Sequence, residues 1–208
     1  LAFVVLISVV SISYLKLKKM NQALTEANIR LEQLSQHDPL TGLYNRQYFE
    51  PRVQQALALC QRQQLPLTLA MMDLDHFKQI NDKLGHSFGD QCLKDFAQLC
   101  QSQFQRKDDL LVRYGGEEFI LVSVGSDAET MQQLLEDFLQ RLEAHQVRLN
   151  HQRGRCTVSI GWYCDIPPAT MDSRSLVELA DQALYQAKDA GRNCAVRSEA
   201  TVPTSPDY

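Results

Sequence analysis

Two adjacent glycines, Gly115 and Gly116, separate two runs of alternating apolar residues at positions 110–114 and 119–123. A two-glycine turn between such runs predicts a β-hairpin, because glycine readily takes the positive φ angles that tight turns need. Glu117 and Glu118 follow directly, where the second strand begins, although glutamate is a poor strand former. The two carboxylates are therefore candidates for a functional site, and a solvated acidic turn is the alternative.

A second pair of carboxylates closes an earlier apolar run. Residues 66–72 form a short continuous apolar stretch, as expected for a strand that is buried on both faces. Asp73 and Asp75 follow, and Asp75 is explained as the cap of a helix that begins at Phe77, whereas Asp73 is not. Since Mg²⁺ is usually held by one or two carboxylates plus substrate phosphates, we expect a divalent-metal site for a phosphorylated substrate, with Asp73 as its leading ligand.

Six segments carry a pattern that is specific as a series. They are, in order, residues 38–46 (DPLTGLYNR), 73–82 (DLDHFKQIND), 85–90 (GHSFGD), 113–119 (RYGGEEF), 157–161 (TVSIG) and 180–193 (ADQALYQAKDAGRN). The series resembles the signature of the GGDEF family of diguanylate cyclases, from about Ser35 to Val196. The third signature position is Glu117 instead of aspartate, which the family commonly allows.

The resemblance implies an activity and a set of catalytic residues. Similar enzymes join two GTP molecules into cyclic di-GMP and release two pyrophosphates. Asp73, the backbone carbonyl of Leu74 and Glu117 would hold Mg²⁺, with Mn²⁺ as the alternative metal, and the metal would help activate the attacking 3′-hydroxyl. Glu117 or Glu118 would accept the proton, and the sequence does not separate the two. Lys78 would face the phosphates, with a solvated helix lysine as the alternative.

Further residues would bind the substrate. Asn81 and Asp90 would recognise guanine, with His86 nearby, because a carboxylate accepts from the guanine N1–H and amine and an amide both donates and accepts. Lys188 and Arg192 are four residues apart, so we expect them on one helix face, contacting the β- and γ-phosphates. The alternative is a basic last turn that interacts with the helix dipole.

Arg106 and Asp109 precede the glycine pair at the spacing of the family's inhibitory site, where cyclic di-GMP docks and limits synthesis. Arginine can bind guanine or phosphate through two hydrogen bonds. A weak surface ion pair between the two residues is the alternative.

Residues 1–15 are apolar except for three serines and a tyrosine. They are too few to span a bilayer, which needs about 20 residues, so we interpret them as the end of a transmembrane helix. A buried soluble helix is the alternative. Lys16, Lys18 and Lys19 follow, and the positive-inside rule then places the downstream domain in the cytoplasm, at the inner membrane.

Residues 16–36 carry a seam of apolar residues at alternating three- and four-residue spacings: Leu17, Met20, Leu24, Ala27, Leu31 and Leu34. Such a seam predicts a parallel two-stranded coiled coil, with an amphipathic helix packed on the domain as the alternative. A homodimer suits the implied chemistry, because two GTP molecules need two active sites face to face.

For residues 37–198 we predict an α+β domain with a palm-like, mostly antiparallel sheet covered by helices. The expected helices are 46–63, 77–83, 87–103, 128–146 and 175–190, and the expected strands outside the hairpin are 66–72, 155–163 and 193–197. Residues 199–208 are expected to be a disordered tail.

Composition and domain content limit the other functions. The formal charge of −4 and the lack of a basic stripe argue against a nucleic-acid polymer as partner. Six scattered cysteines predict reduced, mostly buried thiols. A degenerate GTP- or cyclic di-GMP-binding module is the main alternative function. A phosphodiesterase would need a further domain, and Asn81 with Asp90 argues for guanine over another nucleotide.

Overall fold

The computed structural model describes residues 13–22, 24–25 and 36–199. The chain divides into two compact units, Leu1–Gln36 and His37–Tyr208. In the first unit, residues 13–22 and 24–25 are helical, and no helix in the described part of the chain is long and apolar enough to cross a membrane. The side chains of Leu17, Met20 and Leu24 are 53–62% exposed.

Several predictions for the termini fall outside the described residues. They are the seam positions Ala27, Leu31 and Leu34, residues 1–12 of the predicted transmembrane segment, and all but the first residue of the predicted tail.

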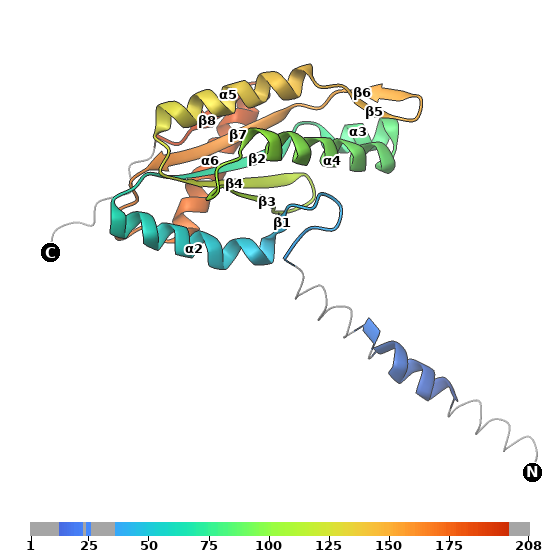
Figure 1. The fold of residues 1–208 in the computed structure, drawn as a ribbon. Helices are drawn as coiled ribbons and strands as arrows, with labels where there is room; N and C mark the ends of the chain where they lie inside the picture. Colours follow the sequence, from blue (N-terminus) through green and yellow to red (C-terminus); the bar gives the residue numbers. More distant parts are fainter. Residues whose placement is uncertain (1–12, 23, 26–35, 200–208) are drawn as a thin grey trace, which may run out of the picture. The chain divides into compact units, whose positions relative to one another are not determined.

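A six-stranded sheet forms the centre of the second unit (Figure 1), in the order β1-β3-β4-β2-β7-β8. Its strands are β1 (Tyr44–Asn45), β2 (Leu67–Leu74), β3 (Leu110–Arg113), β4 (Glu118–Val124), β7 (Val158–Asp165) and β8 (Ala195–Arg197). The three central pairings are antiparallel, and the pairings of β1 with β3 and of β7 with β8 are parallel. The predicted α+β fold with a mostly antiparallel sheet is confirmed.

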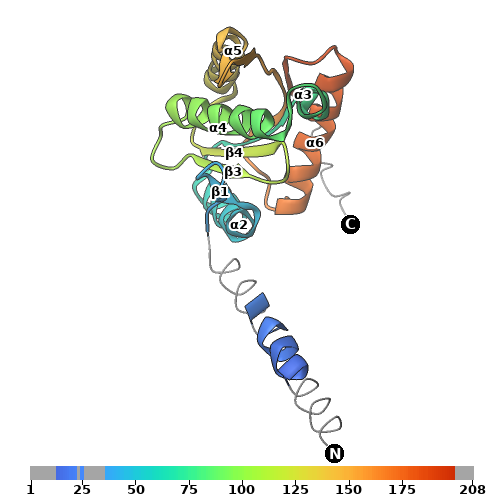
Figure 2. The ribbon, with the colours of Figure 1, turned by 90° about the vertical axis from the view of Figure 1, so that its right-hand side faces the viewer.

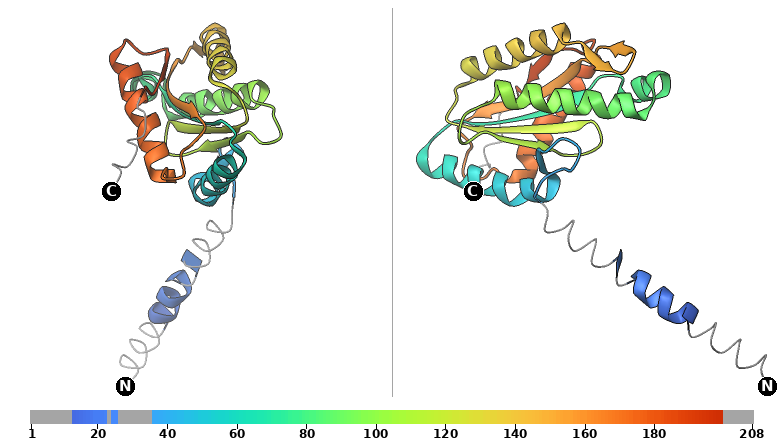
Figure 3. Two further views of the ribbon diagram at one scale, coloured as in Figure 1. Left: turned by 90° about the vertical axis from the view of Figure 1, so that its left-hand side faces the viewer. Right: turned by 45° about the vertical axis from the view of Figure 1, so that its right-hand side comes forward.

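Helices cover both faces of this sheet (Figures 2 and 3). Helices α3 (Phe77–Leu84), α4 (His86–Gln103) and α5 (Ala128–Ala144) lie on one face, and α2 (Arg46–Gln63) and α6 (Ser173–Asp189) on the other. Along β2, Met72 and Leu74 pack into the core beneath α4 and α5, whereas Leu69 and Met71 pack into the core against α2 and α6. Since strand side chains alternate, Asp73 faces the α6 side.

The two cores bury large side chains and thiols. On the α4 side, the rings of Phe96 and Phe119 are 4.6 Å apart between centroids, and Phe138 contacts Phe96 edge-on. All six cysteines are free, and five of them are buried, as predicted. Burial raises the pKa of the Cys100 thiol well above its ordinary value, which makes that thiol unreactive.

Helix α6 packs very closely on β7 because residue 161 is glycine. A Cβ atom on Gly161 would lie 1.9 Å from the backbone nitrogen of Leu184 and 2.2 Å from the carbonyl oxygen of Ala180. The missing side chain lets the helix backbone contact the strand directly. This contact brings the C-terminal end of α6 toward the end of β2.

Some element boundaries differ from the prediction. The predicted strand 155–163 is shifted to Val158–Asp165, since residues 155–157 belong to no strand. Residues 152–154 form β6, which pairs with β5 (Val147–Leu149). Helix α5 begins after Asp127, whose carboxylate accepts from the Thr130 amide at 2.7 Å, and it ends at Ala144, two residues before the predicted end. The short strands β1, β5 and β6 were not predicted, since two or three residues carry no detectable period.

Candidate active site

The β3–β4 turn and the end of β2 meet at one edge of the sheet. Asp73 pairs in register with Glu118, so the two side chains lie on the same face. Glu117 precedes the strand, and its carbonyl oxygen accepts from the Leu74 amide at 3.3 Å. The Glu118 carboxylate covers Gly115, where a Cβ atom would lie 2.7 Å from Glu118 Oε2. The two predicted carboxylate segments therefore lie together at this edge of the sheet, with Glu118 and not Glu117 opposite Asp73.

Asp73 forms an ion pair with Lys188 in this structure. Its Oδ2 is 2.9 Å from Nζ of Lys188, in the last turn of α6, and the two side chains are 15% and 33% exposed. The sequence placed these residues in one site without predicting their contact. An ammonium group on the carboxylate shows that the position attracts positive charge, and the nearby carboxylate and carbonyl oxygens suit Mg²⁺.

The protein donors available for a metal are few. Within residues 13–22, 24–25 and 36–199, no group of three or more His, Cys, Asp or Glu side chains could hold an ion. A set of two carboxylates with a backbone carbonyl is typical of Mg²⁺ sites that substrate phosphates complete. The residues thus fit a nucleotide-associated metal better than a closed structural one.

The predicted helical face for Arg192 is wrong. Helix α6 ends at Asp189, Gly191 has a φ of 110°, and the Arg192 amide donates to the carbonyl of Ala187 at 3.1 Å. This is a Schellman-type end, in which a left-handed glycine turns the chain away from the helix axis. Arg192 therefore lies in the following loop, where it is exposed.

The predicted capping role of Asp75 is also wrong. The residue at the cap of α3 is His76, with a φ of 55° and no side-chain capping bond. Asp75 is buried, and its carboxylate accepts hydrogen bonds from Thr157 Oγ1, Ser159 Oγ and the backbone amide of Asn193.

Asn81 lies on α3, beside the start of α4. A Cβ atom on Gly89 would lie 1.9 Å from Asn81 Oδ1, so the glycine makes room for the amide. Asn81 Oδ1 is buried and has no hydrogen-bond partner among the residues that the structure describes. His86 and Asp90 are both on α4 and exposed, as is Lys78 on α3. An unpaired buried acceptor is costly, which favours a site that a ligand donor completes.

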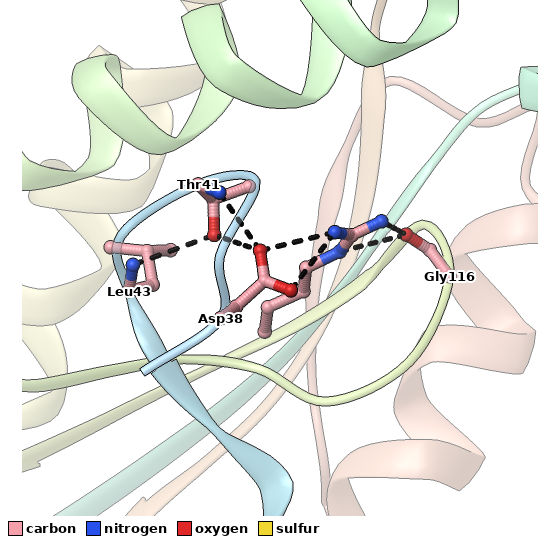
Figure 4. Close-up of polar contacts among 5 residues, drawn as sticks. Asp38, Thr41, Leu43 and Gly116 are labelled. Atoms are coloured by element: carbon pink, nitrogen blue, oxygen red, sulfur yellow. Dashed lines mark hydrogen bonds and ion pairs between the residues drawn. The ribbon is translucent and has the colours of Figure 1, made fainter. Parts of the chain in front are cut away.

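The loop before β1 is bound to the β3–β4 turn through Arg113 (Figure 4). The guanidinium donates to Oδ1 and Oδ2 of Asp38 at 3.1 and 3.2 Å, and to the carbonyl of Gly116 at 2.8 and 3.1 Å. Asp38 Oδ1 also accepts from the Thr41 amide and hydroxyl. Burial raises the pKa of Asp38, but the hydrogen bonds from Thr41 and Arg113 outweigh burial, so the pKa is below its ordinary value.

Sequence reasoning had assigned no role to Asp38 or Arg113. Asp38 lies in the motif segment 38–46 and Arg113 in the segment 113–119, and these positions could have suggested a role for both residues. The 75-residue separation between them hides the contact from any local pattern.

Arg106 and Asp109 form a tight turn in which their side chains point to different partners. Asp109 Oδ2 accepts from the Arg106 amide at 3.1 Å, and the Arg106 guanidinium donates to Ser126 Oγ. Asp109 Oδ1 is buried and unpaired within the described residues. The alternative of a simple ion pair between the two side chains therefore does not describe this turn.

Residues 35–194 match the family described as diguanylate cyclase, GGDEF domain. This chain belongs to the GGDEF family. Its relatives include the diguanylate cyclase DgcS of Shewanella oneidensis, 39% identical over 76% of this chain and 51% of the relative. The probable diguanylate cyclase DgcT of Escherichia coli is 37% identical over 78% of this chain and 36% of its own length. The chain thus spans about half or less of these curated relatives.

Solved GGDEF domains share the fold of this chain. The GGDEF domain of DgcB from Caulobacter crescentus, in complex with c-di-GMP, aligns with a TM-score of 0.74 and 30% identity over 79% of this chain and 94% of that one. The structure described as the active GGEEF domain of a diguanylate cyclase from Vibrio cholerae aligns with a TM-score of 0.69 and 32% identity, over 76% and 98% of the two chains.

Proposed function

We propose that this GGDEF domain condenses two GTP molecules into cyclic di-GMP and releases two pyrophosphates. The observation that carries the proposal is the edge of the sheet where Asp73, Glu118 and the Glu117 backbone meet, with the Lys188 ammonium 2.9 Å from the Asp73 carboxylate. Two relatives named as diguanylate cyclases support it, as does the signature GGEEF that this chain shares with the active Vibrio cholerae domain.

The site residues divide into metal-binding and proton-accepting groups. Asp73, the Leu74 carbonyl and Glu117 would hold Mg²⁺ or Mn²⁺, which neutralises phosphate charge and activates the 3′-hydroxyl when bound. Glu117 or Glu118 accepts the proton of that hydroxyl.

A separate group binds the nucleotide. Lys78, Lys188 and Arg192 contact the phosphates, where each adds positive charge beside the developing negative charge. Asn81 and Asp90 recognise guanine, with His86 beside them on α4. The buried, unpaired Asn81 Oδ1 would accept from a guanine N–H.

Two copies of the chain act together, since each site binds one GTP and the reaction joins two. The exposed side chains of Leu17, Met20 and Leu24 on the N-terminal helix support a coiled-coil dimer. A solved DgcB structure described as coiled coil and GGDEF domain supports the same arrangement, with a TM-score of 0.74.

The apolar composition of residues 1–15 and the lysines that follow support attachment to the inner membrane, with the catalytic domain in the cytoplasm. Recovery of the protein in the soluble fraction of lysed cells, without detergent, would contradict this attachment.

The test of the proposed activity is product analysis after incubation of the purified protein with GTP and Mg²⁺. We expect cyclic di-GMP and pyrophosphate, loss of product when EDTA removes the metal, and recovery on adding Mg²⁺ back. Asp73→Asn should lower the rate by about a hundredfold or more, because a charged group at the reacting phosphates is lost. Asp181→Asn, on the exposed surface of α6, is the matched control. Bound but unconverted GTP would instead identify a binding module.

A further inference from the structure

Asp75 is a buried carboxylate that joins three segments of the chain. Asp75 is only 4% exposed, although it follows Asp73, near the end of β2, by just two residues. Oδ1 accepts from Ser159 Oγ at 2.6 Å, and Oδ2 accepts from Thr157 Oγ1 at 2.7 Å and from the Asn193 amide at 3.1 Å. Buried carboxylates need such donors, since an unpaired buried charge is very costly.

The segment that Asp75 holds at Asn193 has an unusual backbone. Gly191, Arg192 and Asn193 are three consecutive residues with φ angles of 110°, 67° and 47°. Left-handed conformations are unfavourable for residues with a side chain, and they persist where surrounding contacts impose them.

Hydrogen bonds to several elements hold this loop in place. The Arg192 amide donates to the Ala187 carbonyl within the end of α6, and the Ile160 amide donates to the Cys194 carbonyl on the sheet side. The bond from the Asn193 amide to Asp75 is the one that ties the loop to the end of β2. It is also the one that involves a charged acceptor, and such bonds are about twice as strong as neutral ones.

The same carboxylate therefore connects the two sides of the proposed triphosphate site. On one side is the β2 end with Asp73, and on the other is the end of α6 with Lys188, followed by the Arg192 loop. Both oxygens of Asp75 are engaged by donors from within the domain, so its role differs from that of a ligand.

We propose that Asp75 is a positioning residue, which sets the Lys188–Arg192 segment at the correct distance from the metal-binding end of β2. This inference rests on the proposed function, because it takes Lys188 and Arg192 as the phosphate-binding groups. The geometry predicts that Asp75 affects binding of the triphosphate and leaves binding of the guanine base unchanged, since Asn81 and Asp90 lie on α3 and α4.

The experiment compares equilibrium binding of a non-hydrolysable GTP analogue and of GMP, in Mg²⁺, to the full chain and its variants. For Asp75→Ala we expect an affinity for the analogue about tenfold lower, the scale of one lost contact to a charged group, with GMP affinity unchanged. Asp75→Asn should lose less affinity than Asp75→Ala, because its neutral carbonyl can still accept from Thr157 and Asn193 while the Ser159 hydroxyl rotates to accept from its amide. The exposed Asp82→Asn is the matched control.

A second comparison tests whether Asp75 acts through Arg192. In the Arg192→Ala background, Asp75→Ala should cost less analogue affinity than it does in the wild type, because one of the two phosphate-binding groups that it positions is gone. Equal losses for the analogue and GMP, or full additivity with Arg192→Ala, would overturn the proposal. Should Asp75→Ala not fold, Thr157→Val removes one of the donors that hold the Asp75 carboxylate and should show a smaller loss that is again confined to the analogue. The binding readout needs no turnover, so absence of cyclic di-GMP from the wild-type reaction would count against the cyclase activity alone.

Discussion

The Arg106 guanidinium donates a hydrogen bond to Ser126 Oγ, and one Asp109 carboxylate oxygen accepts from the Arg106 backbone amide. The other Asp109 oxygen is buried and has no partner in the described part of the chain. The Arg106 guanidinium is thus the group of this turn that a ligand could engage. Arg106 is exposed, and a guanidinium released from one hydroxyl can bind guanine or phosphate through two bonds. We propose that the pair binds cyclic di-GMP and restrains synthesis.

Arg106→Ala should relieve inhibition by added cyclic di-GMP. Loss of a bidentate contact is worth about 1–3 kcal/mol, so the inhibition constant should rise by about tenfold or more. Initial rates at a series of product concentrations measure it. Ser126→Ala is the control, since it frees the guanidinium without removing it, and inhibition should remain. Unchanged inhibition in Arg106→Ala would remove the regulatory role of this turn.

Among the elements, the loop of residues 38–43 and the β3–β4 turn are joined by the Asp38–Arg113–Gly116 contacts (Figure 4). The Asp38 and Arg113 side chains are 17% and 14% exposed, so water screens the pair only in part. Glu117 and Glu118 follow this turn directly. The Asp38–Arg113–Gly116 contacts therefore attach the turn to the segment that begins the domain.

This link should stabilise the fold in a pH-dependent way. Because the pKa of Asp38 is lowered on folding, its contribution is complete above the ordinary value of 3.8 and is lost as the pH falls through the lower folded-state value. Asp38→Asn should therefore cost about 1 kcal/mol of unfolding free energy near neutral pH, and this cost should shrink in acid as the wild-type carboxylate is protonated. Denaturant unfolding at several pH values measures this. The exposed Asp82→Asn should show no such difference, and a cost of Asp38→Asn that persists in acid would contradict the charged link.

For the whole molecule, activity should depend on dimer formation, since each domain is proposed to bind one of the two GTP molecules. Leu24→Lys with Leu31→Lys should lower specific activity in dilute protein and leave it nearly unchanged in concentrated protein, because like charges in the seam weaken the dimer. Activity and light scattering over a dilution series measure both effects. Gln22→Lys with Asn28→Lys adds the same charge outside the seam and should leave both unchanged. Full activity of the seam variant at high dilution would mean that another surface joins the domains.

The sequence determined what depends on neighbours along the chain. The glycine pair predicts the hairpin, and the apolar run before Asp73 predicts the buried strand, since turns and strand burial follow local rules. The order of the motif segments was sufficient to identify the family.

Only the tertiary structure decided which side chains meet. Asp75 had the local pattern of a helix cap, yet its partners Thr157 and Asn193 lie 82 and 118 residues away. Arg192 had helical spacing from Lys188, yet a left-handed glycine ends the helix between them. The Asp73–Lys188 pair forms because α6 packs directly on Gly161. Contacts between distant segments have no sequence period, so they become visible only when packing brings those segments together.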